Sequence, residues 1–118
     1  MSTIKVSNIR IASESVSRPV TGVAAAWCHF DTKTDPITER DSLNMAVLTD
    51  HGPGETTLGY TNDMASINYP LCTSSSGVNT YEVNSAHTAS TCKIFTTNAA
   101  DNVADTTSVS VVIHGDLA

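Results

Sequence analysis

The chain reads as a succession of short extended segments, and this pattern constrains its fold more than any other feature. About seven segments of alternating or β-forming residues recur roughly every ten residues, at 23–30, 43–49, 56–61, 69–74, 80–84, 92–97 and 108–114. Clusters of Ser, Asn, Asp and Gly separate them. No segment sustains a 3.6-residue apolar period, and only 63–67 suggests a single helical turn. The pattern predicts one all-β domain, an antiparallel β-sandwich or small barrel, and we favour the sandwich.

The apolar residues of these segments are few for a free-standing domain of 118 residues. Aromatic residues make up only 5% of the chain. Burial against sister subunits would supply what one copy lacks, so we expect an obligate homo-oligomer. The expected core residues are Trp27, Phe30, Leu43, Met45, Val47, Leu58, Tyr60, Ile67, Tyr69, Leu71, Val83, Ile94, Phe95, Val109, Val111 and Ile113.

The first 21 residues differ from the rest and read as an extended N-terminal arm. Ile4 and Val6 alternate with polar residues, whereas Ile9 and Ile11 continue on the opposite parity. One strand face cannot hold both pairs unless a bulge or bend intervenes near Ser7. A Ser-rich stretch with one Pro follows. We therefore place an arm at 1–21, a knob domain at 22–118, and assembly contacts of the arm at Ile4, Val6, Ile9 and Ile11.

The charge pattern argues against nucleic acid as a partner. The net charge is −6, and the six basic residues are scattered rather than clustered. The N-terminus lacks the apolar segment of a signal peptide, and no apolar run approaches the length of a membrane span. We expect a soluble protein made in a cytosol, without a membrane partner. Three cysteines, none in a CxxC or CxH spacing, are expected to be small buried hydrophobic residues.

No arrangement of side chains predicts catalysis or a cofactor. The four histidines are far apart and never at metal-ligand spacing, GxSxG is absent, and most carboxylates fall in turns. The loop around His51 has one alternative reading, a calcium site formed by Asp50, Glu55 and nearby carbonyls, although it lacks the alternating carboxylates of a dedicated site. We therefore expect no enzyme, no metal and no cofactor.

A specific set of motifs runs from Gly22 to Asp116. They are Ala26-Trp27 with Phe30, Arg40-Asp41-Ser42-x-Asn44, Leu48-Thr49-Asp50-x-Gly52-x-Gly54, Tyr60-Thr61 with Met64, Asn68-Tyr69, and Val109-Ser110-Val111-x-Ile113-x-Gly115-Asp116. On these residues the chain resembles a small β-domain that recurs in virion proteins of tailed bacteriophages, especially fibre proteins. It departs from the usual pattern at Cys28, His29 and His114. The motifs read as folding signals, because Asp50-x-Gly-x-Gly supplies the positive-φ positions of a hairpin.

The resemblance implies a virion structural protein, assembled in the host cytoplasm. The leading hypothesis is a homotrimeric short tail-fibre or fibre-tip protein, whose arm binds a tail or baseplate protein and whose polar loops meet the host surface, including its glycans. The candidate receptor-facing residues are Ser75, Asn79, Asn84, His87, Asn98 and Asp101. The alternative is a capsid decoration or cement protein bound to the major capsid protein, which the brevity of the chain favours. A more distant alternative, a free carbohydrate-binding module, lacks an aromatic platform beyond Trp27.

Overall fold

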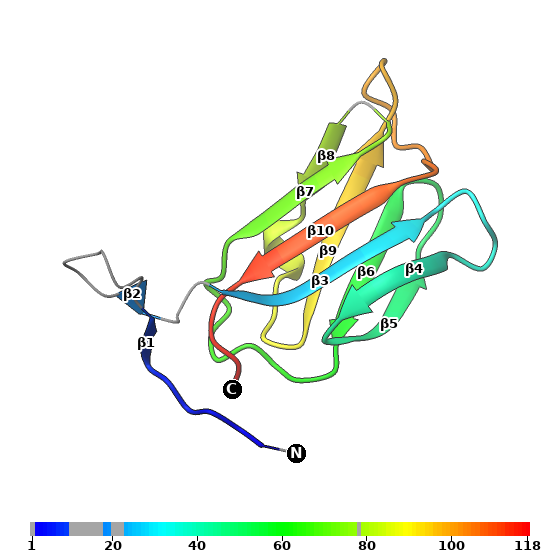
Figure 1. Cartoon of the computed structure of the whole chain (residues 1–118). Helices are drawn as coiled ribbons and strands as arrows, with labels where there is room; N and C mark the ends of the chain where they lie inside the picture. Colours follow the sequence, from blue (N-terminus) through cyan, green and yellow to red (C-terminus); the bar gives the residue numbers. More distant parts are fainter. Residues whose placement is uncertain (1, 10–17, 20–22, 78) are drawn as a thin grey trace.

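A computed structural model describes residues 2–9, 18–19, 23–77 and 79–118, and these form an all-β fold (Figure 1). The expected antiparallel β-sandwich is confirmed, because two four-stranded antiparallel sheets pack face to face. The elements are β1 (Asn8–Ile9), β2 (Arg18–Pro19), β3 (Ala24–Asp31), β4 (Thr38–Leu43), β5 (Met45–Asp50), β6 (Glu55–Tyr60), β7 (Leu71–Ser75), β8 (Asn79–Glu82), the 3-10 turn η1 (Asn84–Ala86), β9 (Thr91–Thr97) and β10 (Val109–His114).

The two sheets have the strand orders β4-β3-β10-β7 and β5-β6-β9-β8. The first strand of the sandwich, β3, pairs with the last, β10, so the beginning and end of the domain are joined at the centre of one sheet. Hairpins connect β3 to β4, β5 to β6 and β8 to β9 within a sheet, and the remaining connections cross from one sheet to the other. β1 and β2 pair only with each other, as a small two-stranded ribbon outside the sandwich.

The sandwich has eight strands where the sequence pattern predicts about seven, and the difference arises at residues 38–50. The expected strand at 43–49 corresponds to β5, and β4 before it was not expected. Between the two strands, Asn44 adopts φ 58° and redirects the chain from one sheet to the other. β4 was missed because nearly all of its residues are exposed, so they carry no apolar alternation. The helical turn expected at 63–67 is also wrong, since Met64 forms an isolated antiparallel bridge with Leu117.

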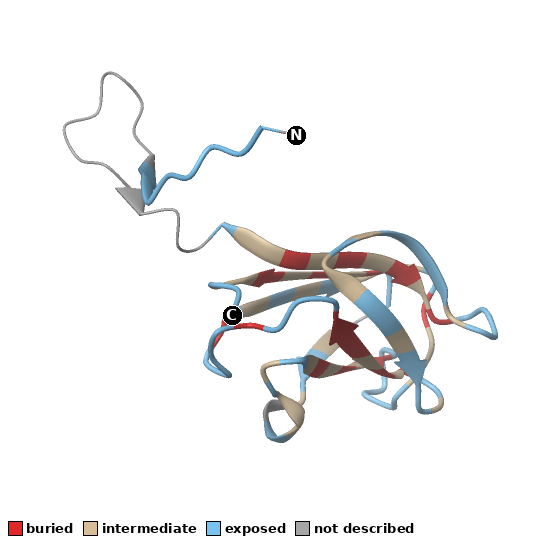
Figure 2. Ribbon diagram, turned by 90° about the horizontal axis from the view of Figure 1, so that it is seen from below, coloured by how far each residue is buried: buried red, intermediate tan, exposed pale blue. Residues whose placement is uncertain are grey.

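Alternating side chains from the central strands fill the space between the sheets. Figure 2 marks the buried residues in red along these strands. In β3 the residues Ala26, Cys28 and Phe30 point inward, and in β10 every second residue from Val109 does the same. The core contains Ala26, Cys28, Phe30, Leu58, Tyr60, Met64, Tyr69, Cys92, Ile94, Val109, Val111 and Ile113. Several expected core residues are wrong: Trp27, Val83 and Phe95 are only partly buried, and Leu43, Val47 and Ile67 are exposed.

Because the strands are antiparallel, their connections lie at two opposite ends of the sandwich. We call the end at which the arm joins the proximal end and the opposite one the distal end. The distal end carries the β3–β4 connection at 32–37, the β5–β6 turn at 51–54, the β7–β8 connection and the long β9–β10 connection at 98–108. The proximal end carries 61–70, 83–90, the C-terminal 115–118 and the start of β3, where the arm joins (Figure 1). None of the described segments forms a helix with the length and hydropathy that crossing a bilayer requires.

Candidate functional site

The distal end is a set of loops braced against one another by hydrogen bonds. The backbone N–H of Gly54 donates to Asp105 Oδ1 at 2.7 Å, and the Gly54 carbonyl accepts from Thr96 N at 2.8 Å. Thr32 Oγ1 donates to the Thr106 carbonyl at 3.1 Å and accepts from Thr106 N at 2.9 Å. Two loops, the β3–β4 connection in one sheet and the β5–β6 turn in the other, are thereby tied to the long 98–108 connection. A loop held in this way presents a fixed surface and loses little conformational entropy when it binds a partner.

An exposed group of three side chains sits where this long connection meets β8, and we call it the Asp101 cluster. Asn79 Nδ2 donates to Asp101 Oδ1 at 2.8 Å, and Tyr81 Oη donates to the same oxygen at 3.3 Å. Asp101 adopts φ 58°, which directs its side chain back toward the strand, and Tyr81 remains 46% exposed. Two of these residues, Asn79 and Asp101, were candidates from the sequence. Tyr81 was missed, because only the fold places it beside them.

The other sequence candidates are distributed differently. Asn98 lies at the distal end, but its side-chain oxygen accepts from the N–H groups of Ala100 and Asn102 and shapes the loop itself. The expectation for Ser75 is wrong, since its hydroxyl is buried. Asn84 begins η1 at the proximal end, away from the distal loops, and its side chain lies outside the described part of the chain. The expectation for His87 is wrong as well, because its ring is buried at the proximal end.

His87 belongs to a buried aromatic network at the proximal end. Its ring stacks on Tyr69 with centroids 4.8 Å apart, and its Nε2 lies 3.3 Å from Glu82 Oε1, outside hydrogen-bond geometry. Tyr60 Oη donates to Tyr69 Oη at 3.0 Å, and the Tyr69 proton is shared between the carbonyls of Thr88 and Thr91, each at 3.0 Å. Burial raises the pKa of Tyr69 to about 12 and that of Tyr60 well above its ordinary value. Both phenols are therefore neutral at physiological pH and hold the 61–70 and 83–90 segments together.

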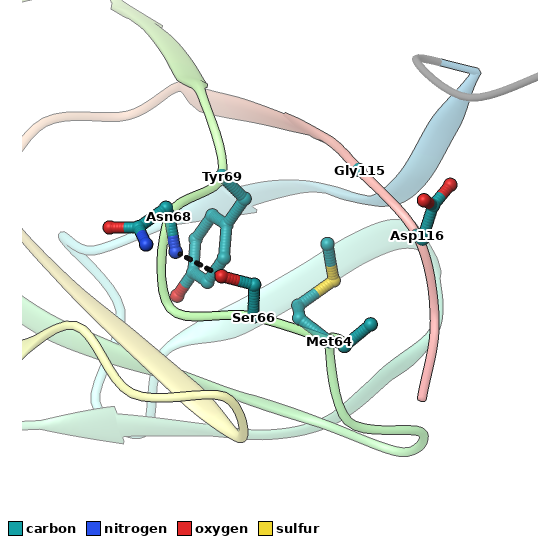
Figure 3. A pocket seen from close by; sticks show the side chains of 7 residues that line it. Met64, Ser66, Asn68, Tyr69, Gly115 and Asp116 are labelled. Carbon is teal, nitrogen blue, oxygen red and sulfur yellow. Dashed lines mark hydrogen bonds between the residues drawn. The ribbon is translucent and has the colours of Figure 1, made fainter.

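A small pocket of about 180 Å³ lies next to this network (Figure 3). Tyr69 and the Met64 side chain face it from one segment, and Gly115 and Asp116 border it from the C-terminal segment. The N–H of Asn68 donates to Ser66 Oγ at 3.0 Å on its rim. The lining holds one carboxylate, that of Asp116, and no nucleophile beside a base.

A second hollow, of about 400 Å³, lies on the other side of the C-terminal segment, at the root of the arm. It is lined by Val6 and Ser7 from the arm, by Val23 to Ala25, and by Gly115 to Leu117. Val6, Val23 and Leu117 are about half exposed, and Ile4 is 86% exposed. The expected bend is present at Ser7, directly before β1. Of the other arm residues, Ile9 pairs with Arg18 in the β1–β2 ribbon, and Ile11 lies outside the described residues.

The polar side chains of the loop considered for calcium binding all contact other groups of the chain. Asp50 Oδ1 accepts from Gly52 N at 2.8 Å, His51 Nε2 lies 2.9 Å from Thr57 Oγ1, and Glu55 forms an ion pair with Lys93. In the part of the chain that the structure describes, no three or more His, Cys, Asp or Glu side chains gather closely enough to hold a metal ion.

The three cysteines divide into two kinds. Cys28 and Cys92 are buried in the core as expected, and burial raises their thiol pKa values to about 12 and about 11. The expectation for Cys72 is wrong, since it is exposed on the outward side of β7. Cys72 is therefore the accessible thiol among the three.

The chain was compared with known proteins in three ways. No protein-family model, curated protein sequence or solved structure matches it.

Proposed function

We propose that this chain is a non-enzymatic structural protein of a tailed-bacteriophage virion, in which a homotrimer forms a short tail fibre or fibre tip that contributes to host attachment. The observation that carries the proposal is that the two ends of the molecule differ (Figure 1). The arm leaves one end of the sandwich, and a hydrogen-bonded, polar loop surface covers the other. An anchor and a receptor surface at opposite ends are what an attachment protein requires. The sequence resemblance described above supports the same placement.

The motif that carries this resemblance acts structurally at the distal end. Arg40 is the extra residue of a β-bulge opposite β3, and its guanidinium pairs with Asp31 at 3.1 Å. The same guanidinium donates to the Thr107 carbonyl at 2.7 Å, so it also holds the end of the long distal connection. The bulge therefore aims the Arg40 side chain at a loop that it stabilises. This agrees with a motif selected for folding rather than for catalysis.

The Asp101 cluster is the part of the distal end best suited to a host glycan. Sugars are bound by an aromatic face for their apolar side and by planar amide or carboxylate groups for their hydroxyls. Tyr81 offers a half-exposed ring, while Asn79 and Asp101 offer the polar groups beside it. Because Asp101 already accepts from both neighbours, the three side chains are held in position before binding.

Gold-labelled antibody against this chain, viewed on intact virions by electron microscopy, tests the placement. Label at the tail tip or baseplate is expected. Label distributed over the head would replace the tail-fibre assignment by the capsid decoration alternative, and absence of label would contradict a virion protein altogether.

A competition assay tests the attachment surface, with purified protein blocking adsorption of the phage to its host cells. Replacement of Tyr81 or Asp101 by Ala is expected to weaken competition about tenfold or more, the loss typical of a central binding residue. The control is Asp63→Ala, which removes an exposed carboxylate at the proximal end. Equal competition by all three variants would contradict the assigned surface.

A further inference from the structure

Two aromatic side chains lie next to each other on the outward face of the β5-β6-β9-β8 sheet, beside the Asp101 cluster. The register places Tyr81 of β8 opposite Phe95 of β9. Both rings point outward, because Ile94 and Thr96, the neighbours of Phe95 in β9, are buried. Directly opposed residues of an antiparallel pair have Cβ atoms about 5 Å apart, so the two rings form one continuous aromatic surface. This surface is not visible in the sequence, because its two residues belong to different strands.

Hydrogen-bonding groups border this aromatic surface on both sides. Toward the distal end lies the Asp101 cluster, whose amide and carboxylate are already held in position. Toward the proximal end, Lys93 forms an ion pair with Glu55, and its Nζ lies 5.7 Å from the centroid of the Phe95 ring. We call the whole surface, Tyr81, Phe95, Lys93 and Glu55 together with the Asp101 cluster, the Tyr81 strip.

The Tyr81 strip is long enough for more than one sugar. Asn79 at its distal end is opposite Thr97, and Lys93 at its other end lies further along the same strand, β9. The strand segment from Thr97 to Lys93 spans about 14 Å, which exceeds the width of one pyranose ring. Sugars are bound through an aromatic surface for their C–H groups and through fixed polar groups for their hydroxyls. The strip offers this combination twice, at Tyr81 with the Asp101 cluster and at Phe95 with Lys93.

The charges of the strip select against acidic sugars. Asp101 carries a negative charge, and the neighbours that donate to it, Asn79 and Tyr81, are neutral. The positive charge of Lys93 is matched by Glu55. The whole chain has a net charge of −6. A glycan that carries carboxylates or phosphates would therefore meet uncompensated negative charge at the strip, whereas a neutral glycan would not.

We propose that the Tyr81 strip binds a neutral oligosaccharide of two or more sugars and discriminates against acidic ones. One sugar lies on Tyr81, which is 46% exposed, and its hydroxyls bind the Asp101 cluster. The next sugar lies against the partly exposed ring of Phe95, and its hydroxyls bind Lys93. This inference rests on the proposed attachment function and names the class of glycan that the attachment surface takes.

Binding of the purified protein to a printed oligosaccharide array tests the inference. Each neutral member of the array is paired with the uronic acid oligosaccharide of the same length, such as galactose and galacturonic acid oligomers. At least one neutral member is expected to bind, and to bind more tightly than its acidic counterpart. Asp101→Asn keeps an oxygen for both donors and removes the charge, so it should narrow this preference by up to about fivefold, the effect of one exposed charge.

Three further variants separate the Tyr81 strip from the opposite face of the sandwich. Tyr81→Ala should weaken binding of the neutral oligosaccharide about tenfold or more. Phe95→Leu keeps apolar volume but removes the second ring, and it should weaken binding about threefold or more. The matched control is Trp27→Leu, which removes an aromatic ring from the outward face of the other sheet and should bind like the parent. Circular dichroism shows that each variant is folded.

An array on which no neutral oligosaccharide binds, or binding that is lost in Trp27→Leu and kept in Tyr81→Ala, would overturn the inference. A preference for acidic oligosaccharides that Tyr81→Ala abolishes would overturn the neutral class and leave the attachment surface of the proposed function standing. Neutral binding by a protein that does not compete with phage adsorption would sustain the strip and contradict the proposed function.

Discussion

Gly54 is the position where a single methyl group should cost most. It adopts φ +69° in the turn between β5 and β6, and its backbone lies directly against the distal loops. A Cβ at this position would stand 2.4 Å from the Thr96 carbonyl oxygen and 2.6 Å from Ala104 N. Both are backbone atoms, so neither can move aside as a flexible side chain would. The same residue also forms the hydrogen bonds to Thr96 and Asp105 that brace the distal end.

Gly52 supplies a matched control in the same turn. Its φ of +119° also disfavours an L-residue, yet no atom lies within 4 Å of where its Cβ would be. Gly52→Ala should therefore lose only the conformational term, about 1–2 kcal/mol. Gly54→Ala adds an overpacking term of about 1–3 kcal/mol and the weakening of a hydrogen bond worth about 1 kcal/mol. We expect about 4 kcal/mol in total, a large share of the 5–15 kcal/mol typical of a domain.

Urea denaturation followed by circular dichroism measures both losses directly. In thermal melts the same energies correspond to a midpoint lower by about 15 °C for Gly54→Ala and by about 5 °C for Gly52→Ala. Equal destabilisation of the two variants would refute the argument, because it would mean that the backbone contacts of Gly54 cost nothing beyond its φ angle.

Two further predictions concern the proximal network and Cys92, a core thiol that interacts with Tyr60. Cys92 and Tyr69 have pKa values raised by burial to about 11 and about 12, so the folded state holds protons that the unfolded state loses from about pH 9 upward. The stability that these groups contribute should be complete below pH 9, the ordinary pKa of a thiol, and should fall as pH rises toward 12. In Cys92→Ala the melting temperature should fall less steeply over this pH range. A melting temperature of the parent protein that does not change at alkaline pH would contradict this prediction. Tyr69→Phe leaves the Tyr60 hydroxyl and two backbone carbonyls without their partner and should cost about 1–3 kcal/mol in urea denaturation. Tyr60→Phe removes one donor and should cost about 1 kcal/mol, so a larger loss at Tyr60 than at Tyr69 would oppose the assigned roles.

Some expectations from the sequence hold because they depend on neighbouring residues alone. The alternation in β3 and β10 is local, and it identifies Phe30 and Val111 as inward-facing. The glycines of the Asp50-x-Gly-x-Gly turn adopt the positive φ angles that the turn needs, and Asp50 caps it through Gly52 N. The bend at Ser7 follows from a change of parity between flanking isoleucines and valines. Each of these signals is complete within about ten residues of chain.

Other expectations fail because they depend on what lies across the sheet. β4 is polar and exposed because it is an edge strand, and an edge strand needs no apolar face. His87 looks like a loop residue in the sequence, yet its ring packs on Tyr69 from a different segment. Trp27 was expected in the core because it is large and apolar. Its place in the alternation of β3 puts it on the outward face instead.

The sequence by itself determined an all-β sandwich and the tight turn at 51–54, since hydrophobic period and turn chemistry depend on consecutive residues. Only the tertiary structure decided which loops share an end, that Asp101 meets Asn79 and Tyr81, and that Trp27 aligns with Leu43, Val112 and Cys72. These contacts join strands that are distant in the chain. Strand order and register create them, and both result from burying the whole core at once rather than from any local pattern.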